Sequence, residues 1–153
     1  MNSKAGGEGP VIRNRKALYD YHILDRWEAG IELRGSEVKS LREGKGNLQD
    51  AYARIEGGEV FLVNAHISPY DPAARDNHDP RRERRLLLHR QEIRRLFGKV
   101  NEKGLTLVPL SLYFQKGKVK VELALATGKK QYDKRAAIKE KDIRRAKQRG
   151  DDY

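Results

Sequence analysis

The sequence predicts a mainly β protein with flanking helices (an α+β fold), in which roughly six antiparallel strands close into a small barrel. Apolar residues alternate with polar ones in several separate runs, which is the period of a half-buried strand. Glycines join these runs at hairpin spacing, and only two stretches of the body have the spacing of a helix. We therefore expect an antiparallel barrel of the oligonucleotide-binding type, and a β-sandwich is the alternative.

The first strand is expected in the segment YDYHILDRW, residues 19–27. Its side chains alternate with a period of two, which indicates a strand with one face buried. The residues expected on that buried face are Tyr19, Tyr21, Ile23 and Trp27. The segment IELRG, which follows Gly30, repeats the alternation.

Two short helices are expected to flank the barrel. In SEVKSLREG, Ser36 is the expected N-cap, Val38 and Leu41 are three residues apart, and Gly44 ends the run. In LLLHRQEIRRLFGKV, apolar residues recur at helical spacing, so a second helix is expected to start near His89.

Two hairpins are expected to supply the other strands. AYARIEGGEVFLVNAHI contains two alternating runs joined at Gly57-Gly58, and LTLVPLSLYF and KVKVELALA meet around Gly117. Pro109 within the third of these runs indicates an edge or a bulge. One face of the last strand is expected to carry Val119, Val121, Leu123 and Leu125. Residues 68–85, rich in proline and charge, are expected to form a long loop.

The charge of the chain indicates its class of partner. Its 153 residues include 33 Lys and Arg against 22 Asp and Glu, which gives a net charge of +11. Such an excess favours a polyanion, and nucleic acid is the commonest polyanionic partner. An anionic membrane is the alternative, but it would need a basic helix with a bulky apolar face, which the sequence does not clearly show.

The absence of cysteine limits the chemistry of the chain. It excludes disulfide bonds, thiolate metal sites and cysteine nucleophiles, and it fits the reducing cytoplasm, where we expect the protein. No apolar run approaches the ~20 residues that cross a bilayer. The segment MNSKAGGEGP lacks the apolar stretch of a secretory signal, and residues 1–12 are expected to be a flexible lead.

Neither a metal site nor catalysis is expected. The four histidines are far apart in the sequence, whereas metal ligands usually cluster. His78 and Asp79, beside arginines, could serve a ribonuclease, but no second histidine and no nucleophile motif supports that interpretation. We therefore expect no enzyme activity, no metal and no cofactor.

Arginines are concentrated between Arg81 and Arg95, where they outnumber glutamates seven to two. Arginine binds phosphate through two parallel hydrogen bonds and stacks on bases. Arg90 and Arg94 are four residues apart and share a helical face. This stretch is expected to contact phosphates, and a solvated charged face is the alternative.

The segment from Gly128 to Tyr153 contains ten Lys or Arg and five Asp or Glu. It is rich in helix formers but has too few apolar residues to dock on a core, and an isolated helix of this length is marginal in water. We expect a tail over residues 128–153 that is disordered when free and helical when a polyanion neutralises it. A merely solubilising tail is the alternative. Residues 13–127 are then expected to form the nucleic-acid-binding barrel with its helices.

An ordered series of segments resembles the bacterial SsrA-binding protein family (small protein B, SmpB). The series comprises NRKALYDYHI, EAGIELRGSEVKSLREGKGNLQDAYARI, NAHISPY, NHDPRRERRLLLHRQEI, KGLTLVPLSLYF, KVKVELALATGKKQYDKR and the basic tail. It extends from Asn14 to about Asp142, and its specificity comes from the whole series rather than from any one segment.

The resemblance implies a barrel of the oligonucleotide-binding type that binds the tRNA-like domain of transfer-messenger RNA. It implies delivery of that RNA to stalled ribosomes for trans-translation, without enzyme activity or metal. The tail would become helical in an mRNA channel that holds no message. A monomer is expected. The alternative is a generic tRNA- or ribosome-binding protein with the same type of barrel.

The resemblance also implies site residues. Those expected to bind RNA are Asn14, Arg15, Lys16, Glu28, Lys39, Ser40, Arg42, Arg81, Arg82, Leu87 and His89. Glu28 is expected to accept from a base amino group or to orient an arginine, and a strand-end turn residue is the alternative. Leu87 is expected to pack on a sugar or base, and plain core packing is the alternative. Those expected at the decoding centre and mRNA channel are Lys129, Lys130, Tyr132, Asp133, Lys134 and Arg135.

Overall fold

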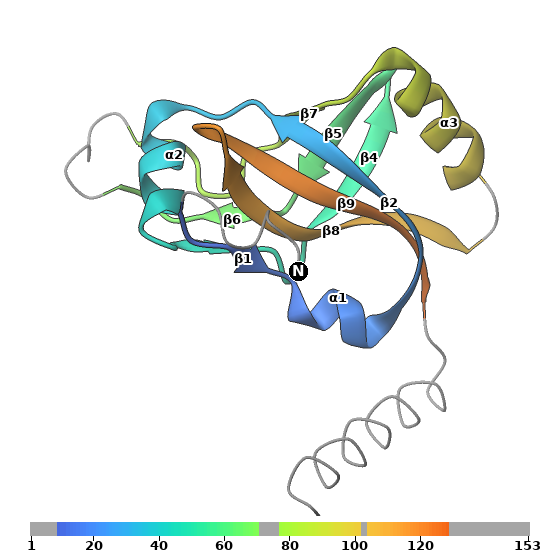
Figure 1. Ribbon diagram of the computed structural model, residues 1–153, viewed down its shortest axis with the longest axis horizontal. Helices are drawn as coiled ribbons and strands as arrows, with labels where there is room; N and C mark the ends of the chain where they lie inside the picture. Colours follow the sequence, from blue (N-terminus) through green and yellow to red (C-terminus); the bar gives the residue numbers. More distant parts are fainter. Residues whose placement is uncertain (1–8, 71–76, 102–103, 129–153) are drawn as a thin grey trace, which may run out of the picture.

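The structure is a computed structural model that describes residues 9–70, 77–101 and 104–128. The elements in these ranges (Figure 1) are β1 (Ile12–Arg13), α1 (Arg15–Asp20), β2 (Tyr21–Ile31), α2 (Gly35–Arg42), β3 (Gly46–Asn47), β4 (Tyr52–Glu56), β5 (Glu59–Val63), β6 (His66–Ile67), β7 (Arg84–Leu87), α3 (Arg90–Val100), β8 (Leu105–Gln115) and β9 (Lys118–Gly128). None of the described helices is long and apolar enough to cross a bilayer.

Six strands form a closed antiparallel barrel. They follow one another in the order β8, β4, β5, β7, β2 and β9, and β9 pairs again with β8. β1 adds to β8, and β3 and β6 pair separately. In Figure 1, α2 and α3 lie at opposite ends of the barrel and α1 packs beside β8. The expected mainly β barrel with flanking helices is confirmed.

Both expected hairpins are confirmed. Gly57 and Gly58 join β4 to β5 with φ of 61° and 77°, and Lys116 and Gly117 join β8 to β9 with φ of 52° and 75°. Two consecutive positive φ angles are the requirement of a two-residue turn whose twist matches that of the strands. Glycine meets this requirement without strain, which explains its use at three of the four positions.

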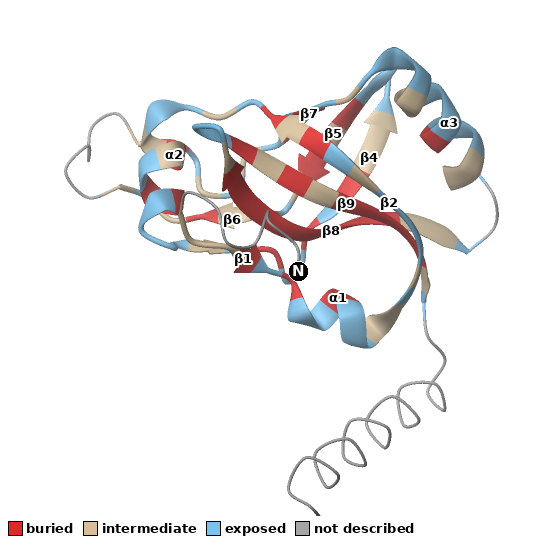
Figure 2. Cartoon of the chain, viewed as in Figure 1, coloured by how far each residue is buried: buried red, intermediate tan, exposed pale blue. Residues whose placement is uncertain are grey.

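The main core fills the barrel. The expected inward face of β9 is confirmed, because Val119, Val121, Leu123 and Leu125 are all at most 7% exposed. A second, smaller cluster lies between α1 and the other face of β8 and β9, and Ala17 is the residue that α1 buries there. β8 is buried along most of its length (Figure 2), because its residues contribute to both clusters.

Two bulges move strands β8 and β2 from one cluster to the other. In β8 the register shifts between Pro109 and Ser111, which confirms the expected bulge. In β2 it shifts between Ile23 and Asp25. Since one extra residue reverses the alternation, Ile23 packs against the small cluster and Trp27 against the main core. The expectation that both lie on one face is therefore wrong.

Three further expectations are corrected. Tyr19 is in α1, where the side chain of Asn14 accepts from the backbone N–H of Ala17, so the strand starts only at Tyr21. The first two residues of β7, Arg84 and Arg85, lie within the expected loop, because the inward residue Arg84 breaks the apolar alternation. Ser36 is not an N-cap, because α2 begins at Gly35.

The barrel contains a buried ion pair between α2 and β7. Glu37 and Arg84 are both 0% exposed, and Nε of Arg84 donates to Oε2 of Glu37 at 2.5 Å. Arg82 also donates to both oxygens of Glu37. The Nη1 of Arg84 donates to the carbonyl of Ala65 at 2.8 Å, and its Nη2 donates to that of Pro80 at 3.0 Å. This pair therefore ties α2, β7 and two loops together.

The surroundings of the pair keep both the Glu37 carboxylate and the Arg84 guanidinium ionised. Burial raises the pKa of Glu37, but hydrogen bonds from Arg82, the backbone N–H of Arg34 and Arg84 outweigh it, so the pKa lies below its usual range. Burial lowers the pKa of Arg84, and Glu37 opposes that change. A guanidinium stays protonated at every pH at which proteins fold, so the pair is ionic at neutral pH.

We predict that Glu37→Gln lowers the free energy of unfolding at neutral pH by about 3 kcal/mol, because it leaves Arg84 buried without its counter-charge. Since the pKa of Glu37 is depressed in the folded state, its contribution is complete above its ordinary pKa of 4.5 and is lost as pH falls through the folded value. Denaturant unfolding between neutral and acidic pH measures both effects.

The control is Glu43→Gln, at the exposed C-cap position of the same helix, where Glu43 pairs with Lys45 at 3.0 Å. An exposed pair contributes less than about 1 kcal/mol, so this variant should remain close to wild type. Equal stability of the Glu37 and Glu43 variants would contradict the role of the buried pair.

Candidate nucleic-acid interface

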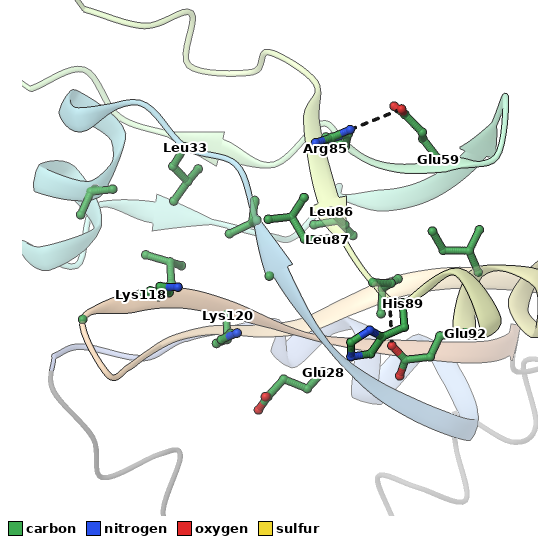
Figure 3. Close-up of a pocket in the computed structure, with 17 residues that line it drawn as sticks. Glu28, Leu33, Glu59, Arg85, Leu86, Leu87, His89, Glu92, Lys118 and Lys120 are labelled. Atoms are coloured by element: carbon green, nitrogen blue, oxygen red, sulfur yellow. Dashed lines mark hydrogen bonds and ion pairs between the residues drawn. The ribbon is translucent and has the colours of Figure 1, made fainter.

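A groove of about 800 Å³ opens where β2 leaves β9 and pairs with β7. Its walls come from β2, β7, the start of α3 and the turn between β8 and β9 (Figure 3). The polar and charged residues that line it are Glu28, Glu59, Arg85, His89, Glu92, Lys118 and Lys120. Leucines and valines fill the spaces between them, so the groove offers both charge and apolar surface.

Three of the expected site residues meet in this groove. Glu28 comes from β2, Leu87 from the end of β7 and His89 from the N-cap position of α3. Leu87 is 45% exposed, and it alternates with the buried Leu86, so core packing does not explain it. The backbone N–H of His89 donates to Oε1 of Glu92 at 3.0 Å, which fixes the start of α3.

Two lysines of the groove, Lys118 and Lys120, were missed by sequence reasoning. Lys118 and Lys120 occupy outward positions of β9, opposite Leu87 and His89 across the groove (Figure 3). The alternation KVKVE contains the signal for them, because its buried valines require that the lysines between them point outward. Arg85 also lines the groove, where it pairs with Glu59 at 3.3 Å.

Glu28 is held by a residue that the sequence did not indicate. It lies directly opposite Glu122 across β2 and β9, and two like charges at such positions repel. The hydroxyl of Tyr113 donates to Oε2 of Glu28, while Arg26 pairs with Glu122 at 3.6 Å. Burial raises the pKa of Tyr113 and the bond to Glu28 raises it further, so the hydroxyl keeps its proton and remains a donor.

Asn14 and Ser40 serve the fold directly. Asn14 is 4% exposed, and its Nδ2 donates to the carbonyls of Leu48 and Pro109 at 3.0 and 2.9 Å. Ser40 is fully buried, and its hydroxyl donates to the carbonyl of Ser68 at 2.6 Å. Their side chains therefore position α1 and α2 from inside the protein.

The expected cations of α1 and α2 are exposed but lie outside the groove. Arg15 and Lys16 are on α1. On α2, the ammonium of Lys39 lies 5.6 Å from the centre of the ring of Tyr70, and the guanidinium of Arg42 lies 4.7 Å from that of Phe114. Contacts with aromatic rings hold these two charges in place without neutralising them.

Arg81 and Arg82 differ in their surroundings. Arg81 is exposed, and its Nη1 donates to the carbonyl of Asn64 at 3.3 Å. Arg82 is half-buried and is engaged with Glu37, so it supports the buried pair. The six expected tail residues, from Lys129 to Arg135, lie outside the described residues.

His78, the histidine nearest to a possible catalytic arrangement in the sequence, is buried. His78 is 3% exposed, and its ring nitrogens bond to the hydroxyl of Ser36 at 2.9 Å and the carbonyl of Ile67 at 2.8 Å. It is therefore inaccessible to a substrate. Among the described residues, no three acidic or histidine side chains gather closely enough to hold a metal ion.

We predict that Tyr113→Phe weakens RNA binding by roughly fivefold, because a hydrogen bond to a charged group contributes about 1.5–3 kcal/mol, part of which orients Glu28. Glu28→Gln should weaken binding at least as much, and the double variant should show no further loss. Tyr52→Phe, on the exposed face of β4, is the control. Losses that add in the double variant would show that Tyr113 does not act through Glu28.

Comparisons with known proteins agree with this geometry. The family model described as "SmpB protein" matches residues 11–152. An SsrA-binding protein of Trichodesmium erythraeum is 59% identical over 150 residues, which is 96% of each chain. One from Syntrophobacter fumaroxidans is 62% identical over 135 residues, 88% of this chain and 84% of the relative.

A solved structure is also similar. It is described as "tmRNA-SmpB: a journey to the center of the bacterial ribosome" and superimposes with a TM-score of 0.69 at 56% identity. The match covers 80% of this chain and 87% of the solved one. With the family model and the curated relatives in agreement over nearly the whole length, this chain belongs to the SmpB family.

Proposed function

We propose that this protein is an RNA-binding adaptor that binds the tRNA-like domain of transfer-messenger RNA and delivers it to stalled ribosomes for trans-translation. The observation that carries the proposal is the groove, where Glu28, Leu87 and His89 meet beside Lys118 and Lys120. The names of the relatives, which are SsrA-binding proteins, and of the solved tmRNA-SmpB neighbour support it.

The groove has the chemistry that a folded RNA requires. Lysines attract the phosphates of an RNA of any nucleotide sequence. An apolar side chain and an aromatic ring can instead pack on a sugar or an unstacked base. Leu87 and His89 supply the second kind of contact. Glu28 supplies an acceptor for an amino group or a ribose hydroxyl, and its negative charge disfavours a phosphate at that position. The combination selects a particular RNA shape rather than any polyanion.

The other expected RNA residues belong to the same proposal. Arg15, Lys16, Lys39, Arg42 and Arg81 are exposed and would contact phosphates around the groove or on the ribosome. The remaining three act from inside the fold: Asn14 and Ser40 would act through the helices that they position, and Arg82 would act through Glu37. The adaptor needs no cofactor and no catalytic group, and it works in the cytoplasm as a monomer.

The tail, residues 128–153, would bind the ribosome in the decoding centre and the mRNA channel. An mRNA channel without message is lined by RNA phosphates, and Lys129, Lys130, Lys134 and Arg135 would neutralise them. Tyr132 would stack on a base of the decoding centre, with Asp133 beside it. About 20 residues of helix reach about 30 Å, which is enough to follow such a channel. A bound message would exclude the tail sterically, so the tail would report its absence.

A generic tRNA- or ribosome-binding protein with the same barrel is the alternative. Both proteins would be basic, so charge does not separate them, but only the adaptor prefers transfer-messenger RNA. A body that neutralises about five or six phosphates should bind with a log–log salt slope of roughly −4 to −5 in both cases.

We predict that the purified protein binds transfer-messenger RNA at least tenfold more tightly than mixed tRNA at about 150 mM salt, where charge alone is largely screened. A chain truncated after Gly128 should bind the RNA equally well but fail to support peptide tagging on stalled ribosomes. Filter binding and a reconstituted tagging reaction measure the two effects.

Each part of this proposal can fail separately. Equal affinity for the two RNAs would support the generic protein. Equal tagging by the truncated and complete chains would leave the RNA-binding role intact and remove the role of the tail. Cleavage of the RNA during incubation with the wild-type protein would contradict an adaptor without enzyme activity.

A further inference from the structure

Arginines on the outer face of β4, β5 and β7 are paired with acids. Arg54 lies 2.7 Å from Glu83 and 3.0 Å from Glu56, and these two glutamates raise its pKa. Arg85 pairs with Glu59 and with Glu32. A polyanion approaching this face would have to break ion pairs, so the positive charge of these arginines is not readily available to it.

Arg90 and Arg94 of α3 are different. Both are exposed, and neither makes an ion pair with another residue of the described ranges. Phe97, on the same helix, is 55% exposed. At 3.6 residues per turn, these three side chains fall within about 60° of one another around the helix axis, away from the buried Leu96. We call Arg90, Arg94, Phe97 and Gly98 the outer face of α3.

The opposite flank of α3 is used by the protein itself. Lys99 lies 3.4 Å from Asp25 of β2 and 5.7 Å from the centre of the ring of Trp27. The backbone N–H of Arg26 lowers the pKa of Asp25, and the charges of Lys99 and Arg95 lower it further. Arg95 is four residues before Lys99 and so shares this flank of the helix, about 100° around the axis from Arg94.

The packing of the fold does not explain why a glycine, Gly98, stands at this position of α3. It lies within the last turns of α3, with no positive φ, and a Cβ built on it would meet no atom within 4 Å. Alanine at such a position is more favourable for a helix, so glycine reduces stability without a packing benefit. Glycine does allow a partner to come close to the helix backbone beside Phe97.

The outer face is continuous with the groove. His89, Glu92 and Ile93, at the start of the same helix, line the groove, and Arg90 follows His89 directly (Figure 3). An RNA strand that leaves the groove at His89 would meet Arg90 first and then Arg94 and Phe97, one and two turns further along.

We propose that the outer face of α3 extends the RNA-binding surface, with Arg90 and Arg94 on phosphates and Phe97 on an adjacent sugar or base. Gly98 lets the sugar–phosphate backbone approach the helix. The occupant is the strand next to the one in the groove, within the same RNA, because the two surfaces share one helix and their charge complements phosphate. This inference rests on the proposed RNA-binding function.

The first test compares two single variants that each remove one positive charge from α3. Arg94→Gln should lower the log–log salt slope for binding of the tRNA-like domain by about 0.7–0.9, the value of one phosphate contact. Arg95→Gln, which changes the flank that faces Asp25, should leave the slope unchanged. Phe97→Ala should weaken binding by roughly fivefold or more without changing the slope, because stacking involves no counterion.

The second test uses Gly98→Ala, for which the two readouts should move in opposite directions. The variant should unfold about 2 °C or more above wild type, yet bind the RNA severalfold more weakly. Equal slopes for the Arg94 and Arg95 variants, or unchanged binding by Gly98→Ala, would overturn the inference. Wild type without preference for the tRNA-like domain would instead contradict the proposed function, since the variants are judged against one another on one RNA.

Discussion

The side chain of Arg84 lies on the core side of β7, and its guanidinium is tolerated there because Glu37 of α2 meets it. Two ions removed from water destabilise a protein unless each finds its partner and its hydrogen bonds, and here all of them are supplied. β7 lies between β5 and β2, so it closes the barrel, and its last residue is Leu87. α3 begins after two intervening residues. The wall of the groove and the start of α3 therefore depend on a strand that the buried pair holds in place.

The same residue type is used in two ways on this surface. Around β4, β5 and β7, arginines are paired with glutamates and stabilise the exposed side of the barrel. In the groove Lys118 and Lys120 keep their charge available, as do Arg90 and Arg94 on α3, and the groove residue Glu28 is held by Tyr113. The net charge of +11 is therefore unevenly available. One face of the protein can attract a polyanion, whereas the arginines of another face are engaged in ion pairs within the protein. Specific RNA binding by a small barrel requires this kind of asymmetry, since evenly distributed charge would bind any nucleic acid in any orientation.

The sequence predicted those features that depend on local chemistry. The glycine turns, the inward face of β9 and the start of α3 at His89 follow from turn requirements and side-chain alternation. The bulge in β2 could not be predicted in this way, because nothing in the local sequence distinguishes an extra residue in a strand from its neighbours. The start of β7 was missed because an arginine between charged residues is typical of a loop. Its burial becomes understandable only with its partner Glu37, which is 47 positions away in the sequence. For the candidate site, the family resemblance indicated Glu28, Leu87 and His89, which the structure brings together, but it also included Asn14 and Ser40, whose burial only coordinates reveal. Tyr113 requires the register of β8, β9 and β2, which no single segment encodes.

The most direct test of the central claim, that the groove is the RNA-binding surface, is amide hydrogen exchange of the complete protein with and without the tRNA-like domain of transfer-messenger RNA. Exchange reports protection residue by residue, and it needs no variant that could alter the fold. The account predicts slower exchange at Leu87–Ile93 and at Lys118–Lys120 when the RNA is bound, with little change in the hairpin of β4 and β5 between Arg54 and Phe61. Protection concentrated on that hairpin, with the groove unchanged, would contradict the account.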